Sequence, residues 1–141
     1  LGEFLDVIGL NEYIGWYGDR KPEDADRMQW RFAFAKPVII TEFGGGAAYG
    51  LHGDAAARFT EEYQANLYQH QLTMLSHISA LAGMSPWVLM DFRSPRRVLP
   101  GIQDYYNRKG LVSDRGRKKQ AFYVLQQFYR EKVRSNAEPR H

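Results

Sequence analysis

The chain has 141 residues, of which 44% are hydrophobic and 25% are charged, and its formal net charge is +3. This balance is typical of a folded globular protein and excludes an intrinsically disordered one. The absence of cysteine excludes disulfides and cysteine-based zinc sites, and the histidines lack metal-ligand spacing. No apolar run is long enough to span a membrane, and nothing at the amino terminus resembles a signal peptide. The compartment stays open.

Three short apolar segments are predicted to be strands. They are Phe4–Leu10, Pro37–Phe43 and Met84–Phe92. The second is rich in β-branched residues and has a proline at its entry, where a strand tolerates it. Because all three are continuously apolar, they are expected to form a parallel sheet that is buried on both faces.

Helices are predicted between and after these strands, at Glu23–Ala35, Asp54–Leu81 and Lys118–Val133. The basic block Arg115–Lys119 is interpreted as the solvated start of the last helix rather than as an arm for nucleic acid. Residues 134–141 are expected to fray. The β-loop-α order fits a doubly wound sheet or a closed barrel. Three strands alone leave two open edges, so the chain is expected to be less than half of a larger fold.

Each predicted strand ends in polar or aromatic side chains, and active sites of β/α folds lie at the carboxyl ends of the strands. Glu42 is the strongest candidate, because a carboxylate at the end of an apolar strand is costly unless it is hydrogen-bonded or used. The glycines at 44–46 leave space in front of it. On the residues alone, an ion pair between Glu42 and an arginine at the rim stays open.

A second cluster, Asn107–Gly110, lies in the long loop before the last helix. Asn107 and Lys109 are two residues apart, so on an extended segment their side chains point the same way. Together they offer amide and ammonium donors to a carboxylate or to a pair of hydroxyls, although an ordinary turn is the simpler interpretation. No phosphate-binding turn is present, which disfavours a nucleotide-binding domain. The aromatic content of 14% suits either a rich core or a sugar-binding cleft.

Several motifs in order, DVIGLNEYIGWYG, KPVIITEFG, GLHG with FTEEYQ, PWVLMDF and NRKGL, resemble the last strands of glycoside hydrolase family two. The resemblance runs from about Asp6 to Tyr129 and is strongest to the β-glucuronidases, then to the β-galactosidases. It implies a retaining enzyme on a (β/α)₈ TIM barrel. Residues 1–133 would supply strands six to eight of that barrel, and residues 134–141 a frayed tail.

The resemblance also implies roles for individual residues. Glu42, in the ITEFG segment, matches the catalytic nucleophile, and hydrogen bonds from neighbours such as Tyr13 are expected to keep it ionised. The peptide bond between Trp87 and Val88 is expected to be cis. No metal or organic cofactor is implied. The residues that match the sugar-binding positions are Asn11, Tyr13, Trp16, Tyr17, Trp87, Asn107 and Lys109.

The acid/base of the family comes from an Asn-Glu pair that ends strand four, whereas the Asn11-Glu12 pair aligns with strand six. Glu12 is therefore not assigned as the acid, which is expected upstream of Leu1. The chain alone is expected to be inactive and to need the remainder of the barrel as its partner. A homo-oligomer stays open, and neither nucleic acid nor membrane is expected as a partner.

The substrate implied by the resemblance is a β-D-glucuronide, because Asn107 and Lys109 match the N-x-K motif that binds the C6 carboxylate. The loop Phe92–Tyr106 departs from the β-glucuronidases because it is longer and more basic. Two alternatives stay open. One is a β-galactosidase of the same family, and the other is a non-catalytic carbohydrate-binding barrel fragment.

Overall fold

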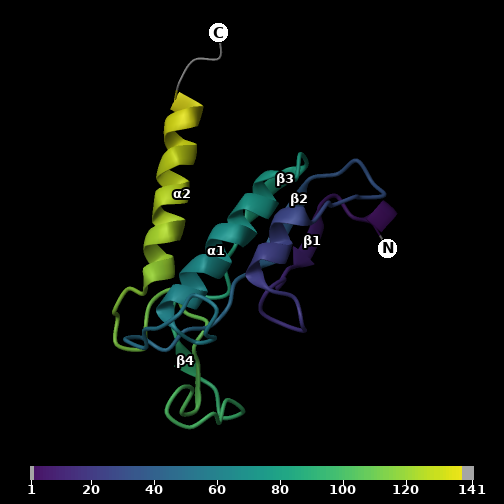
Figure 1. The fold of residues 1–141 in the computed structure, drawn as a ribbon. Helices are drawn as coiled ribbons and strands as arrows, with labels where there is room; N and C mark the ends of the chain where they lie inside the picture. Colours follow the sequence, from purple (N-terminus) through teal and green to yellow (C-terminus); the bar gives the residue numbers. More distant parts are fainter. Residues whose placement is uncertain (1, 138–141) are drawn as a thin grey trace.

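The computed structural model describes residues 2–137 and has an α/β fold, as predicted (Figure 1). Strands β1, β2 and β3 form a parallel sheet in that order, and β4 pairs with β5 in a separate antiparallel hairpin. The elements are η1 (Gly2–Phe4), β1 (Ile8–Asn11), η2 (Pro22–Arg27), β2 (Val38–Glu42), α1 (Glu61–Ser76), β3 (Leu81–Met84), β4 (Phe92–Arg93), β5 (Tyr106–Asn107) and α2 (Gln120–Ala137).

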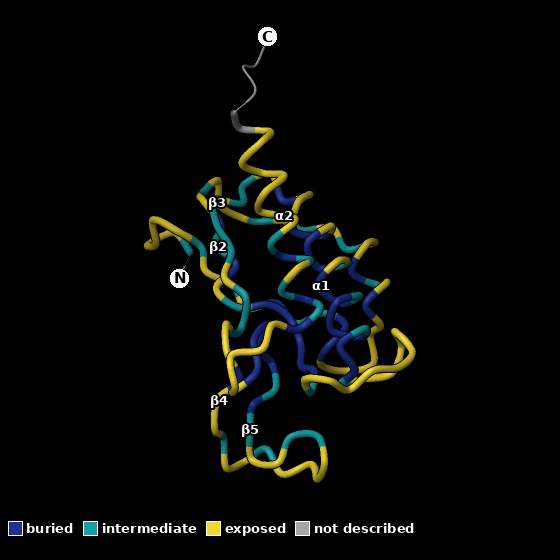
Figure 2. Tube along the Cα trace, turned by 90° about the vertical axis from the view of Figure 1, so that its left-hand side faces the viewer, coloured by how far each residue is buried: buried dark blue, intermediate teal, exposed yellow. Residues whose placement is uncertain are grey.

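The hydrophobic core lies between the sheet and the two helices. Val38 and Ile40 of β2 are fully buried in one cluster with Leu72 and Leu75 of α1 and Leu125 of α2. Helix α1 packs against both α2 and η2. In Figure 2 the buried trace is concentrated where α1 meets the segments that follow the strands, whereas the hairpin loop between β4 and β5 is largely exposed.

The opposite face of the sheet is not covered within the described part of the chain. Gly9 of β1 and Thr41 of β2 lie side by side on it, because a Cβ added to Gly9 would meet Cγ2 of Thr41 at 3.4 Å. Both residues are exposed. The prediction of a sheet buried on both faces is therefore wrong for residues 2–137 taken by themselves.

The predicted helix at Glu23–Ala35 is also wrong. Only η2 forms there, as a 3₁₀ helix that ends at Arg27. Met28, Trp30 and Phe32 then pack against the core from a non-helical segment. Their spacing of two residues is the period of an extended chain rather than of a helix, which explains the difference.

The other element boundaries also differ. The first strand is Ile8–Asn11 rather than Phe4–Leu10, and the long helix ends at Ser76 rather than at Leu81. Helix α1 begins at Glu61 rather than at Asp54, because the Thr60 side chain caps it by accepting a hydrogen bond from the Tyr63 amide at 3.0 Å. The third strand is Leu81–Met84, ahead of the predicted segment. Helix α2 continues to Ala137, so the tail predicted from residue 134 is helical at first, and residues 138–141 lie outside the described residues.

Glu12, in the segment after β1, is a buried carboxyl group with 2% of its surface exposed. Its Oε1 accepts a hydrogen bond from the Ile14 amide, whereas Oε2 has no partner among the residues that the structure describes. Burial raises the pKa of Glu12 from 4.5 to about 7, although the hydrogen bond from Ile14 opposes the shift.

We expect Glu12→Gln to remove a pH-dependent part of the stability. A carboxyl whose pKa is raised in the folded chain favours folding below its unfolded pKa, here near 4.5, and this contribution is lost as the pH rises through about 7. The loss corresponds to about 3 kcal/mol of unfolding free energy.

The measurement is the unfolding temperature of the wild type and the variant at pH 5 and pH 8. Relative to the wild type, the variant should have a higher unfolding temperature at pH 8 than at pH 5. The exposed Glu3→Gln is the matched control. An equal difference at both pH values would contradict the prediction.

Candidate active site

A shift in the pairing of β1 with β2 places Glu42 at the end of the sheet. Leu10 pairs with Ile40, but the next residue, Asn11, pairs with Glu42. One residue of β2, Thr41, is therefore extra, as in a β-bulge. Ile40 and Phe43 are both fully buried in the core, so the two residues between them are turned off the helix-covered side.

Tyr13 and Glu42 are in direct contact. The Tyr13 hydroxyl donates a hydrogen bond to Oε2 of Glu42 at 2.6 Å, which agrees with the contact expected from the sequence. Burial and this bond to the carboxylate raise the pKa of Tyr13, so the phenol keeps its proton and remains a donor. Glu42 itself is half-buried and is left with Oε1 for other contacts.

The Lys109 ammonium also contacts Tyr13, over its aromatic ring. Its Nζ is 4.3 Å from the ring centroids of both Tyr13 and Tyr17, and it donates a hydrogen bond to the Tyr17 hydroxyl. Only 5% of Lys109 is exposed. The two ring faces attract the ammonium and offset part of the cost of burying it. An ammonium has three N–H donors, and two of them have no hydrogen-bond partner among residues 2–137.

The electrostatics of this cluster are set by burial and by positive charge. Burial lowers the pKa of Lys109, while the contact with Tyr17 and the charge of Glu42 oppose the shift. For Tyr17, burial acts to raise the pKa, but the positive charges of Lys109 and Arg97 outweigh it and lower the pKa. Arg97 belongs to the basic loop that the sequence singled out, so this loop adds positive charge beside Lys109.

Asn107 is fixed next to Lys109 by the hairpin. It is buried in β5, opposite Phe92 of β4. Its side-chain Oδ1 accepts a hydrogen bond from the Lys109 amide at 3.1 Å. The oxygen is thus used within the chain, and the amide NH₂ is the group that can donate to a ligand.

Two further predicted site residues border this cluster in different ways. Trp87 follows β3, and its amide donates to the Phe43 carbonyl at 2.8 Å, which holds it beside the end of β2. Its peptide bond to Val88 is cis, as expected. Asn11 ends β1, and its Oδ1 accepts a hydrogen bond from the Thr41 hydroxyl at 2.7 Å.

The remaining two differ in exposure. Tyr17 is 51% exposed and stands at the open side of the cluster. Trp16 is buried, packs edge-to-face on Phe59 and Tyr63, and lies under the Arg58 guanidinium. Trp16 therefore packs beneath the other site residues, and its contact with a ligand stays a prediction.

The sequence did not single out Lys119, which was placed in a solvated basic block. The side chain is in fact fully buried, and its Nζ lies 2.7 Å from Oδ1 of Asp91. Asp91 lies within the segment Met84–Phe92 that is predicted as the third strand. No local signal marks the pair, because the partners are far apart in the sequence.

Within residues 2–137, no group of three or more histidine, cysteine, aspartate or glutamate side chains is arranged to hold a metal ion. Over the same range, no helix combines the length and the apolar character needed to cross a membrane.

No protein-family model matches the chain. A β-glucuronidase from Paenibacillus borealis is 30% identical to it over 132 residues, which cover 89% of this chain and 22% of that protein. A β-glucuronidase from Streptococcus agalactiae is 33% identical over 134 residues, which cover 89% and 21%. The chain therefore spans about a fifth of the length of the curated relatives that it matches.

The fold is similar to a segment of a solved family 2 enzyme. The crystal structure of a GH2 β-galacturonidase from Eisenbergiella tayi bound to galacturonate matches with a TM-score of 0.74 and 29% identity, over 89% of this chain and 24% of that one. Over most of its length, the chain is thus related in sequence and in fold to one segment of the family 2 glycoside hydrolases that include β-glucuronidases and β-galacturonidases.

Proposed function

We propose that the chain is the C-terminal part of the (β/α)₈ barrel of a retaining glycoside hydrolase that cleaves terminal β-D-glucuronides, with Glu42 as nucleophile. Strands β1, β2 and β3 would be strands six, seven and eight, within residues 1–133. The observation that carries the proposal is the hydrogen bond from Tyr13 to Glu42 at the carboxyl end of a parallel sheet, in a chain related to β-glucuronidases over 89% of its length.

In the proposed reaction, Oε1 of Glu42 attacks the anomeric carbon while the glycosidic C–O bond breaks. A second carboxyl group gives its proton to the leaving oxygen and then takes one from the water that hydrolyses the glycosyl-enzyme. The Tyr13 hydroxyl holds Oε2, which orients the carboxylate. Trp87, beside the end of β2, would lie under the sugar ring.

The second carboxyl must stand about 5–5.5 Å from Glu42 in a retaining enzyme. Glu12 is buried against the Ile14 backbone, and Asp91 is paired with Lys119. Neither is therefore suited to the role. We propose that another part of the full-length protein supplies the acid/base.

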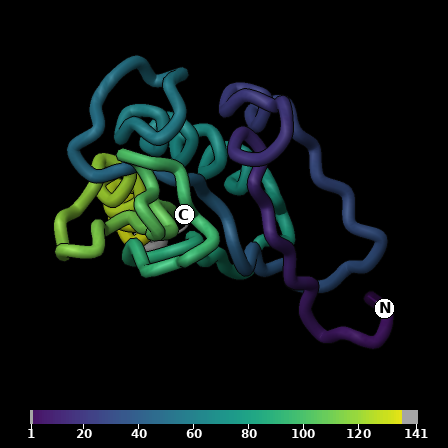
Figure 3. Tube along the Cα trace, turned by 90° about the horizontal axis from the view of Figure 1, so that it is seen from below, coloured from purple at the N-terminus to yellow at the C-terminus, as the bar shows by residue number. Residues whose placement is uncertain are grey.

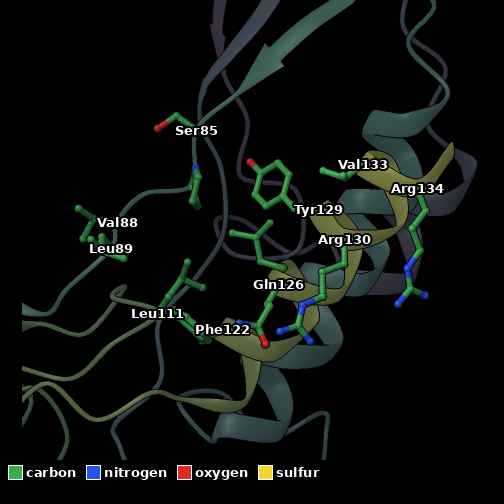
Figure 4. A pocket seen from close by; sticks show the side chains of 12 residues that line it. Ser85, Val88, Leu89, Leu111, Phe122, Gln126, Tyr129, Arg130, Val133 and Arg134 are labelled. Atoms are coloured by element: carbon green, nitrogen blue, oxygen red, sulfur yellow. The ribbon is translucent and has the colours of Figure 1, made fainter. Parts of the chain in front are cut away.

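The remainder of the barrel has a surface to pack on. An apolar groove of about 900 Å³ lies between α2 and the segment after β3 (Figure 4). Phe122, Tyr129 and Val133 of α2 face Val88 and Leu89 across it. Strand β3 is at the edge of the sheet, so the same side also offers unpaired backbone groups. We propose that the first strand and helix of the barrel cover this side.

The proposed substrate follows from the charge near Tyr13. Lys109 offers two N–H donors and Asn107 an amide, which suits the carboxylate of a uronide. A β-galacturonide is the second candidate, because the solved relative from Eisenbergiella tayi is a β-galacturonidase and both sugars carry a C6 carboxylate. A neutral galactoside would leave the buried ammonium without a counter-charge. A non-catalytic fragment is the remaining alternative.

In the full-length protein, Glu42→Gln should lower kcat on 4-nitrophenyl β-D-glucuronide by about 10⁴-fold or more, since the nucleophile is lost. The unfolding temperature should stay close to that of the wild type, because the residue is half-buried and amide and carboxylate have the same shape. A variant that keeps more than a few per cent of the activity would refute the assignment. Glu62→Gln, at a half-buried glutamate in the first turn of α1, is the matched control.

Lys109→Ala should lower kcat/KM for the aryl glucuronide by about a hundredfold, because the carboxylate loses its charged partner. Activity on an aryl galactoside, where the wild type has any, should change little. Lys118→Ala, at an exposed lysine, controls for the loss of one positive charge. Equal losses on the charged and the neutral substrate would count against carboxylate recognition by Lys109.

The 141-residue chain on its own should not hydrolyse any glycoside of a nitrophenyl panel, because the proposed mechanism needs a second carboxyl that it does not supply. The same panel with the full-length protein gives the positive control. Measurable turnover by the purified chain would overturn the proposed division of the active site.

A further inference from the structure

Asp91 and Lys119 form a buried ion pair. Besides each other they contact backbone groups and one side chain, because Nη1 of Arg108 donates to Oδ2 of Asp91 at 3.4 Å. Lys119 is 0% exposed and Asp91 4%. Besides Asp91, the Lys119 ammonium donates to the carbonyls of Ala47 at 2.6 Å and Arg108 at 3.1 Å, so its three donors are filled. Oδ1 of Asp91 also accepts from the Gly110 amide at 2.8 Å.

Two of these backbone groups, those of Arg108 and Gly110, flank Lys109. The Arg108 carbonyl belongs to the peptide that precedes Lys109, and the Gly110 amide belongs to the peptide that follows it. The remaining polar groups of Lys109 are also bonded. Its amide donates to Asn107 and its carbonyl accepts from the Val88 amide at 3.1 Å. The peptide groups around the Lys109 Cα are therefore fixed, and only its side-chain torsions stay adjustable.

The contact with Gly110 is too close for any other residue. A Cβ at this position would lie 2.2 Å from the Asp91 amide nitrogen and 2.5 Å from Oδ1. The approach of Asp91 to the peptide after Lys109 therefore depends on glycine. Seen from below in Figure 3, the segments after β2 and after β3 both pass close to the start of α2. The hydrogen bonds of Lys119 to Ala47 and Asp91 join these two segments.

Stability alone is a weak explanation for such a pair. Burial raises the pKa of Asp91 and lowers that of Lys119, and the attraction between the charges opposes both shifts. Replacing a buried ion pair by neutral groups of similar shape is often neutral for stability, because the desolvation of two charges offsets their attraction. What neutral groups do not reproduce is the orientation of two backbone carbonyls by the ammonium and of one backbone amide by the carboxylate.

We propose that the Asp91–Lys119 pair is a positioning device for the Lys109 ammonium, and thereby sets the preference for substrates with a C6 carboxylate. This inference rests on the proposed role of Lys109. By fixing the backbone on both sides of Lys109, the pair keeps Nζ between the rings of Tyr13 and Tyr17. Asp91 and Lys119 act through Lys109 and do not touch the substrate.

The test is a double-mutant cycle in the full-length protein. Asp91→Asn with Lys119→Met removes both charges together, so no unpaired charge is left buried. On 4-nitrophenyl β-D-glucuronide this variant should lower kcat/KM by about tenfold to a hundredfold, mainly through KM, because a recognition group is misplaced. In a Lys109→Ala background, the same pair of substitutions should have almost no further effect.

A merely structural role would lower the activity equally in both backgrounds, and that outcome would overturn the inference. So would unchanged activity in the wild-type background. If Lys109→Ala itself leaves glucuronide hydrolysis intact, carboxylate recognition by Lys109 fails first, and the positioning role fails with it. The matched control is Asp114→Asn, which removes a carboxylate that lies 2.8 Å from Nη1 of Arg108. This substitution should leave kcat/KM unchanged in both backgrounds.

Unfolding temperatures of all variants show whether each has folded. If the charge-removed pair does not fold, Gly110→Ala takes its place in the cycle, because it displaces Asp91 from the peptide after Lys109 without changing any charge. Its loss of activity should likewise disappear in the Lys109→Ala background. An equal loss in both backgrounds would again refute the positioning role.

Discussion

The site depends on one irregularity in an otherwise regular sheet. If β1 and β2 kept their register to the end, Glu42 would follow Val38 and Ile40 into the apolar core, where an ionised carboxylate is costly. The extra residue Thr41 turns Glu42 away from the helices and brings Phe43 into the core instead. Only then can the Tyr13 hydroxyl, which follows the neighbouring strand, reach the carboxylate.

The cation in the cluster is held by different means. Lys109 follows the β4–β5 hairpin and belongs to neither the parallel sheet nor the helices, so regular secondary structure does little to fix it. Its backbone is instead fixed by bonds from the buried pair, from Asn107 and from Val88. Its charge is stabilised by two aromatic faces and one hydroxyl. Tyr13 contacts both Glu42 and Lys109 and is the link between the two.

The sequence predicted the features that local pattern controls. The β-branched run before Glu42 gave β2 almost to the residue, and the polar ends of the strands marked the cluster around Tyr13. It misjudged Pro86–Val88, which is apolar like a strand but lies in the segment after β3. It also misjudged Lys119, because neither composition nor spacing shows that a lysine will be buried beside an aspartate from a distant segment. Burial of this kind is decided by tertiary packing alone.

Glu42 and Lys109 are held in place differently, so substitutions near them have different effects. The orientation of Glu42 is tied to the register of the sheet and to its buried neighbour Phe43. A substitution that changes the register or replaces Phe43 therefore disturbs the fold and the carboxylate together. The orientation of Lys109 is tied instead to the Asp91–Lys119 pair and to Gly110, which lie outside the parallel sheet. In a chain built this way, the group that recognises the substrate can be altered while the group proposed to perform the chemistry keeps its place.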